Sequence, residues 1–404
     1  MKLLNQMLSR IIKVGTLEIE DAAGKIHVHA GTASPFVRVK LHDPKLYELL
    51  YLQPEMAAGE AYMDGKMTIE KGTLKDFITL FGLNQGAPLS PPAGVIVSFL
   101  ANKIKSSLKD NTLLRSRENV KHHYDISNEL YGLFLDKGLN YSCAYFRTAG
   151  DSLETAQENK LRHIASKMDL KAGQKILDIG CGWGSMSLYL AQHFNVEVLG
   201  VTLSVEQLKL AEERVAALGL GHKVRFALRD YREVEGTFDR IVSVGMLEHV
   251  GAKFLPEYFH TVARLLNAGG VAMIHSICRS DGPGSPAPWL NKYIFPGGYS
   301  PALSEAVAAV EKTGLWITDT EIWRLHYMHT IAAWSERFAE NRARAAELMG
   351  ERFCRMWEFY LVTSEVSFLH FHHVNFQIQL SKSLQTLPLQ RDYMFEAEQR
   401  LLQD

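Results

Sequence analysis

Three glycines and one aspartate near the middle of the chain have the spacing of a nucleotide-binding turn. Residues 175–184 read Lys-Ile-Leu-Asp-Ile-Gly-Cys-Gly-Trp-Gly, and a helix-like stretch follows over 185–193. Gly180 and Gly182 carry no Cβ, so the backbone between strand and helix can approach a ligand closely. Asp178 can orient this loop or receive the ammonium group of an amino-acid-like cofactor, whereas it would repel a pyrophosphate. S-adenosylmethionine (SAM) therefore fits the turn better than NAD.

More polar residues follow the next predicted strands, at the edge where such a cofactor would lie. No acidic residue ends the strand over 196–202, so Gln207 is the expected partner of the ribose hydroxyls. Asp230 and Tyr231 follow the third strand, where they could read and cover the adenine. Each residue alone could equally cap a loop, but their common register with one glycine loop favours a cofactor site. The positions after these strands are Thr202, Leu203, Gln207, Asp230, Tyr231, Val244 and Glu248.

The alternation of strands and helices from Leu170 onward predicts an α/β fold. This pattern builds a doubly wound, mostly parallel, Rossmann-like sheet of the class I SAM-methyltransferase type, with its ligand site at the carboxyl ends of the strands. We therefore expect the polar positions to gather at that edge. Strands are expected over 175–179, 196–202, 224–227, 240–244 and 271–278, helices over 205–218 and 255–266, and a turn over 267–270.

The amino-terminal part is predicted to form a separate, smaller α+β domain. A turn-rich stretch over 86–94 marks its boundary. We therefore divide the chain into a small α+β domain over 1–90, a linker over 91–121 and a catalytic domain over 122–404. In the small domain, strands are expected over 17–20, 25–30 and 36–41, and a helix over 44–52.

The linker contains a basic, amphipathic stretch. Apolar residues recur over 95–108, and the segment 101–121 has six Lys or Arg residues against two acidic ones. A helix of this kind suits an anionic membrane surface. It could equally pack between domains with its charged face in solvent.

The overall composition is that of a soluble, cytoplasmic protein. The chain of 404 residues is 47% hydrophobic and 22% charged, with a formal net charge of −1, which argues against general nucleic-acid binding. Its four cysteines form no C-x-x-C pair, so neither a disulfide framework nor a zinc knuckle is indicated. The histidine clusters lack companion ligands at metal-binding spacing, so no metal is expected. No apolar run approaches the ~18–20 residues of a membrane span.

Seven segments, in order along the chain, resemble cyclopropane-fatty-acyl-phospholipid synthases. The resemblance runs from about Phe36 to about Leu380. Generic methyltransferases share the glycine loop, but not the Tyr-Ser-Cys-Ala-Tyr-Phe or Tyr-Ile-Phe-Pro segments, so the match is specific. The segments are 60–65, 123–125, 141–146 (Tyr-Ser-Cys-Ala-Tyr-Phe), 177–184, 200–204, 238–250 and 292–297 (Lys-Tyr-Ile-Phe-Pro-Gly).

This resemblance implies SAM as methylene donor, an unsaturated phospholipid acyl chain as acceptor, and a bicarbonate ion in the active site. It also implies that the amino-terminal domain handles lipid and that the enzyme associates peripherally with the inner face of the membrane; a homodimer remains open. The family's SAM contacts correspond to Tyr141, Ser142, Gly180, Gly182, Thr202, Leu203, Gln207, Tyr231 and Val244. Its bicarbonate cup corresponds to Cys143, Glu248, His275, Ile277 and Tyr327.

The chemistry explains why such a cup would be needed. An alkene is a poor nucleophile, but its π bond can attack the methyl carbon of a sulfonium, and the resulting cation closes to a ring only when a base removes a proton from the new methyl group. That base must lie within hydrogen-bond reach, with water excluded. Glu248 and His275 would orient the bicarbonate, and Tyr327 would donate a hydrogen bond to it. Cys143 has no neighbouring base or cation in the sequence, so a packing or backbone-contact role is expected rather than a nucleophilic one.

Two departures from the family pattern leave the product open. Ser185 and Met186 stand where many members have Gly and Leu, and Phe368-Leu-His370 replaces a usual Phe-Arg pair. One alternative is a related lipid C-methyltransferase that makes methyl- or methylene-branched chains. Another is a noncatalytic lipid-transfer or membrane-binding protein, which the joint presence of Asp178, Gln207, Glu248 and His275 disfavours.

Overall fold

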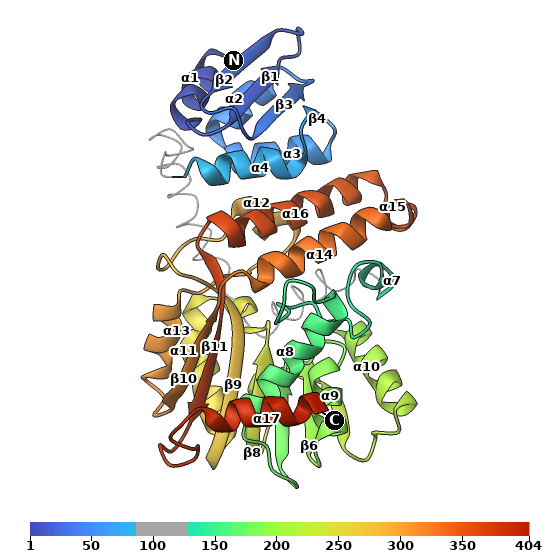
Figure 1. Cartoon of the computed structure of the whole chain (residues 1–404), viewed down its shortest axis with the longest axis vertical. Helices are drawn as coiled ribbons and strands as arrows, with labels where there is room; N and C mark the ends of the chain where they lie inside the picture. Colours follow the sequence, from blue (N-terminus) through green and yellow to red (C-terminus); the bar gives the residue numbers. More distant parts are fainter. Residues whose placement is uncertain (86–127, 404) are drawn as a thin grey trace. The chain divides into compact units, whose positions relative to one another are not determined.

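A computed structural model describes residues 1–85 and 128–403 of the chain (Figure 1). The chain packs as two compact units. The first unit contains the amino-terminal elements together with Pro286–Pro296 and Trp334–His372. The second unit contains the glycine loop and the strands around it. The predicted boundaries at 90 and 121, the helix over 95–108 and the segment 123–125 lie outside the described residues, and they stay predictions.

The first unit is a small α+β structure, as its strand and helix pattern predicts. Its described strands form a sheet of order β2-β1-β3-β4, and the buried residues alternate along β1 and β3. The helix α16 (Glu351–His370), from far along the chain, packs on α3 and α4. The elements are α1 (Lys2–Ile11), β1 (Thr16–Glu20), β2 (Ile26–Ala30), β3 (Phe36–Leu41), α2 (Leu46–Leu52), α3 (Pro54–Met63), β4 (Met67–Lys71), α4 (Leu74–Leu83), α12 (Pro288–Tyr293) and α15 (Arg342–Met349).

The described strands of the second unit form the large sheet, of order β10-β11-β9-β8-β5-β6-β7. Neighbouring strands from β9 to β7 are parallel, whereas β11 is antiparallel to β9 and β10. The predicted Rossmann-like fold is therefore confirmed. The strands are β5 (Lys175–Ile179), β6 (Glu197–Thr202), β7 (Val224–Leu228), β8 (Phe238–Val244), β9 (Leu266–Arg279), β10 (Trp316–Trp323) and β11 (His373–Ser381).

The turn predicted over 267–270 is wrong, because β9 already begins at Leu266. Phe238 pairs with Leu266, and Arg240 pairs with Val271. Four residues of β9 therefore lie between two pairing positions, whereas one residue of β8 separates the partners, so the pairing is irregular at this point. The Ala-Gly-Gly sequence has the composition of a turn, but here it bends a strand without ending it.

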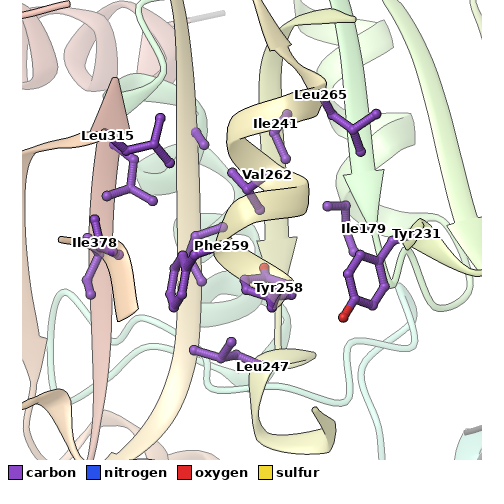
Figure 2. Packing of buried hydrophobic residues seen from close by; sticks show 14 of the residues in the cluster. Ile179, Tyr231, Ile241, Leu247, Tyr258, Phe259, Val262, Leu265, Leu315 and Ile378 are labelled. Atoms are coloured by element: carbon purple, nitrogen blue, oxygen red, sulfur yellow. The ribbon is translucent and has the colours of Figure 1, made fainter. Parts of the chain in front are cut away.

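Helices cover both faces of the large sheet. On one face, α11 (Leu255–Leu265) and α13 (Leu303–Val310) pack against alternate residues of the strands, and Figure 2 shows Phe259 and Val262 pointing from α11 into this core. On the other face lie α8 (Leu153–Lys167) and α9 (Ser185–His193). Each fully buried large apolar side chain contributes about 1.5–3 kcal/mol. The remaining helices are α7 (Asn128–Gly132), α10 (Val205–Ala217), α14 (His326–Glu340) and α17 (Asp392–Gln403).

None of the helices outside 86–127 is long and apolar enough to cross a membrane. In the same part of the chain, no group of three His, Cys, Asp or Glu side chains could hold a metal ion.

Candidate cofactor and active site

The glycine loop joins β5 to α9, and its glycines serve different purposes. Gly182 has φ +53°, and a Cβ built there would meet no protein atom within 4 Å. Gly184 has φ +84°, but a Cβ there would lie 2.5 Å from Cζ of Phe226. Gly184 is therefore needed for core packing, whereas Gly182 leaves the outer side of the loop open for close approach to a ligand.

Asp178 ties the loop to the helix that follows it. Its side chain is 2% exposed, and Oδ2 accepts a hydrogen bond from Oγ of Ser187 on α9 at 2.7 Å. Burial raises the pKa of Asp178 to about 6, although Ser187 and the more distant Lys160 oppose the shift. Of the two roles predicted for Asp178, orientation of the loop is the one that has a contact in the structure.

The predicted cofactor positions after β6 lie close together. Oγ1 of Thr202 donates to Oε1 of Gln207 at 2.8 Å, and both residues are buried. Oγ of Ser204 caps α10 by accepting from the backbone N–H of Gln207 at 3.2 Å. Leu203 lies between them, directly after the strand. The strand end and the helix start therefore place the Gln207 amide at the carboxyl edge of the sheet.

Asp230 and Tyr231 have protein partners of their own. The Asp230 carboxylate forms a bidentate ion pair with Arg232, at 2.9 Å and 2.8 Å. Tyr231 packs edge-on against Tyr258, with ring centroids 5.4 Å apart. The positions follow β7 as expected, and contact with an adenine stays a prediction.

The loop that carries Tyr141 and Ser142 is held by two buried residues of α8 that the sequence analysis did not single out. Nε2 of Gln157 donates to the Ser142 carbonyl at 2.9 Å, and Nζ of Lys160 donates to Oγ of Ser142 at 3.1 Å and to Oδ1 of Asn140 at 2.8 Å. Lys160 is 1% exposed, and burial lowers its pKa to about 8. No local signal in the sequence distinguishes Lys160, because a lysine on a helix usually faces solvent.

Among the predicted cup residues, Glu248 and Ile277 are brought together. Oε2 of Glu248 accepts from Oγ of Ser276 at 2.8 Å, and its carboxylate also accepts from the backbone N–H of Ile277. Burial raises the pKa of Glu248 to about 7 despite these donors. A carboxyl group poised near neutrality at a strand end is typical of catalytic sites.

Cys143 lies on the loop held by Lys160, and it is fully buried. Burial raises the pKa of its thiol well above the usual value, which agrees with a packing role. The next backbone N–H, of Ala144, donates to Oγ1 of Thr330 on α14 at 3.0 Å. Tyr327 belongs to the first turn of the same helix and is 8% exposed.

His275 lies on β9, where it pairs with Val244 at the end of β8. Burial lowers the pKa of His275 to about 3, and Lys160 and Lys167 add to this effect. Both ring nitrogens face amide groups of β11: Asn375 at 3.3 Å from Nε2 and Gln377 at 3.2 Å from Nδ1. The imidazole is therefore neutral, and the two amides of β11 fix its orientation.

The first unit contains an apolar cavity of about 160 Å³. Trp289 from α12 closes part of it, and Gly59 on α3 allows this contact because a Cβ there would meet Nε1 of Trp289 at 2.3 Å. Glu55 is the one carboxylate in the lining, and burial raises its pKa. The lining comes from α1, the small sheet, α2, α3, α4, α12 and α16, and includes Leu8, Val39, Leu50, Ala58, Phe77 and Phe359.

The large sheet, with its glycine loop after β5 and its polar residues at the carboxyl ends of β6 to β8, defines a SAM-dependent methyltransferase. A family model described as mycolic acid cyclopropane synthetase matches residues 111–378. The chain belongs to this family.

The chain is also similar to individual proteins in sequence and in structure. The cyclopropane-fatty-acyl-phospholipid synthase of Escherichia coli is 36% identical over 343 residues, covering 82% of this chain and 84% of the relative. Tuberculostearic acid methyltransferase UfaA1 of Mycobacterium tuberculosis is 34% identical over 359 residues, covering 81% of each chain. The crystal structure of mycolic acid cyclopropane synthase CmaA1 complexed with SAH and CTAB aligns with a TM-score of 0.63 at 30% identity, covering 65% of this chain and 97% of that one.

Proposed function

We propose that the protein transfers a methylene group from SAM to the cis double bond of an unsaturated acyl chain in a membrane phospholipid, forming a cyclopropane ring. The observation that carries this proposal is the carboxyl group of Glu248, which lies half-buried at the carboxyl end of the large sheet, accepts hydrogen bonds from Ser276 and Ile277, and has a pKa of about 7. The E. coli relative, whose name states this activity, supports the choice of product.

The chain offers a consistent set of groups for SAM, which supplies the one-carbon unit on a sulfonium. Gly182 lets the cofactor approach the loop, Asp178 fixes the loop, and Gln207 offers its amide to the ribose. Tyr141 and Ser142 would contact the cofactor from the loop that Lys160 and Gln157 hold. Leu203, Asp230, Tyr231 and Val244 complete the proposed contacts.

Bicarbonate would supply the base, and the charges of the cup are compatible with an anion. The ionised carboxylate of Glu248 would orient bicarbonate by accepting a hydrogen bond from its O–H group, and the pKa of about 7 makes this form available from neutral pH upward. Lys160 adds a buried positive charge that acts on both Cys143 and His275. Cys143, His275, Ile277 and Tyr327 would form the remaining wall.

Lipid analysis of cells that express the protein tests the reaction. Acyl chains should gain one CH₂ group and resist mild hydrogenation, because a ring has no double bond to reduce. Cells that express Glu248→Ala at equal level are the control. Unchanged acyl chains in cells with the active protein would refute the proposal.

A second candidate function is lipid C-methyltransfer that ends in a branched chain. It is favoured by the similarity to a relative whose name describes a tuberculostearic acid methyltransferase. The same lipid analysis separates the two, because a branched product shows either a reducible methylene group or a methyl branch.

We also propose that the first unit takes up an acyl chain in its apolar cavity. Ala58→Trp would fill the cavity, so kcat/KM for vesicle lipid should fall while SAM affinity stays the same. Ala23→Trp, at an exposed turn, is the matched control. If Ala58→Trp is fully active, the cavity does not handle substrate.

The membrane contact is proposed to be peripheral. Lys103, Lys105 and Lys109 belong to the basic stretch of the sequence, and each could add about 1 kcal/mol near an anionic surface. Reversal of these three charges should weaken sedimentation with anionic vesicles. Unchanged sedimentation would assign the stretch to internal packing.

A further inference from the structure

The strand β11 buries amide side chains on the face that meets α8. Asn375, Gln377 and Gln379 are each 1% exposed, and they alternate with Phe376, Ile378 and Leu380 of the apolar core. Buried amides are costly unless they are hydrogen-bonded. Their partners therefore indicate why they are there.

The orientation of Gln377 is determined by a lysine. Nζ of Lys167, at the end of α8, donates to Oε1 of Gln377 at 2.7 Å. An ammonium group has only donors, so the amide oxygen must face Lys167. The NH₂ group of Gln377 then faces Nδ1 of His275, at 3.2 Å.

This orientation selects one tautomer of His275. The imidazole is neutral because burial lowers its pKa to about 3, and a neutral imidazole has one donor and one acceptor nitrogen. Nδ1 faces a donor, so it carries the lone pair, and the proton is on Nε2. Asn375 fits this result if its amide is turned by half a rotation. Its Oδ1, which has no partner among the described residues, would then accept from Nε2–H.

A group of charges holds Lys167 in place. Its Nζ also contacts the carboxylate of Glu321, which accepts from Nε2 of His163 at 2.9 Å. Nδ1 of His163 lies 3.2 Å from Oε2 of Glu398 on α17, and α17 packs along α8 (Figure 1). Burial opposes the protonation of His163, but the two carboxylates raise its pKa overall. Through Glu398, α17 thereby completes a charge network that includes His163, Glu321 and Lys167 and reaches His275 through Gln377.

We propose that Lys167 is a positioning residue that, through Gln377, fixes His275 as the Nε2–H tautomer. Nε2–H is then held by Oδ1 of Asn375 and Nδ1 by the NH₂ group of Gln377, so His275 is a neutral, oriented part of the cup wall and does not act as a proton acceptor there. The functional meaning rests on the proposed function, because that is what places His275 in the cup. The tautomer itself does not depend on it.

The tautomer can be read directly by ¹⁵N NMR of the full chain with labelled histidine, with His275 assigned from the spectrum of His275→Asn. In the parent protein, Nε2 should be protonated and Nδ1 unprotonated. Gln377→Glu keeps the shape but presents acceptor oxygens to both Lys167 and Nδ1, so the proton should move to Nδ1. Lys167→Met removes the constraint, and both tautomers should appear. Lys171→Met, at an exposed lysine near the end of the same helix, should leave the spectrum unchanged.

Activity provides the second readout. Gln377→Glu and Lys167→Met should lower kcat on the order of 10- to 100-fold, as losses of supporting hydrogen bonds do elsewhere, with KM for SAM unchanged. A parent protein with its proton on Nδ1, or a folded Gln377→Glu that keeps the Nε2–H form, would overturn the proposal. A protein that methylates some other acceptor but shows the predicted tautomers would instead refute only the proposed function.

Discussion

The two faces of the β9–β11 pair are equally buried but differ in chemistry. On the apolar face, Ile274 and Ile378 pack with α11 and α13. On the polar face, the His275 ring lies between the amides of Asn375 and Gln377, and Gln377 accepts from Lys167 of α8. Burial of amides and charges is expensive relative to apolar packing. The apolar face therefore provides stability, whereas the polar face lowers it in order to hold an ordered site.

The largest expected effect is on the apolar face. Phe259 is fully buried between α11 and the large sheet (Figure 2), so Phe259→Ala should lower the free energy of unfolding by about 3–5 kcal/mol. Denaturant unfolding measures this, and Leu228→Ala at a half-exposed position is the control. SAM affinity of the folded fraction should persist. Loss of SAM binding in a fully folded variant would show that the two faces are not separable in function.

At Glu248, a substitution is expected to lower activity and to leave stability unchanged. Glu248→Gln keeps the volume and removes the ionisable group, so activity should fall by ~10²–10³ while thermal stability and SAM affinity are retained. Glu212→Gln, at an exposed position of α10, serves as control. Near-parental turnover by Glu248→Gln would remove this residue from the reaction.

In the glycine loop, effects on cofactor binding and on stability can be separated within three residues, Gly182 to Gly184. Gly182→Ala should weaken SAM binding, on the order of tenfold, because its Cβ would project into open space beside the loop. Alanine is preferred to valine because a β-branched residue at φ +53° is strongly strained. Gly184→Ala should instead destabilise the fold through its clash with Phe226. Calorimetry with SAM and thermal unfolding distinguish the two, and equal loss of binding in folded forms of both would contradict the assignment.

The pH dependence should show activity and stability moving in opposite directions. The folded-state pKa of Glu248, about 7, is above its ordinary value of 4.5. The neutral form therefore favours folding below pH 4.5, and this contribution is lost as the pH rises through about 7. If ionised Glu248 orients the bicarbonate, kcat/KM should rise as the pH rises through about 7. Glu248→Gln should abolish this rising limb of the pH–rate profile. An identical rising limb in the variant would assign it to another group.

The sequence predicted the strands around the glycine loop well, because apolar runs bounded by Gly, Ser or Asp are strong local signals. It missed β11, although Asn-Phe-Gln-Ile-Gln-Leu alternates with a period of two. Alternation of this kind is typical of a strand with one face in solvent. No local signal in the sequence indicates that other elements would bury the amide face of β11.

The candidate site was predicted as a set of positions but not as a network. Glu248 and Ile277 meet through backbone geometry at the end of β9, and no motif specifies that contact. Lys160 and Lys167 were not singled out because lysines on an amphipathic helix usually face solvent. Their burial is a consequence of tertiary packing, which a single sequence does not reveal.

Ring formation on an unsaturated phospholipid can be tested directly with the purified protein. Purified protein is incubated with SAM labelled with ¹³C in its methyl group and with vesicles of dioleoyl phosphatidylglycerol, and the extracted lipid is examined by NMR. Vesicles of the saturated dipalmitoyl lipid are the control and should take up no label. We expect the label in a cyclopropane CH₂ group. Label found in a methyl branch or an exocyclic methylene group, or no label in lipid at all, would contradict this expectation.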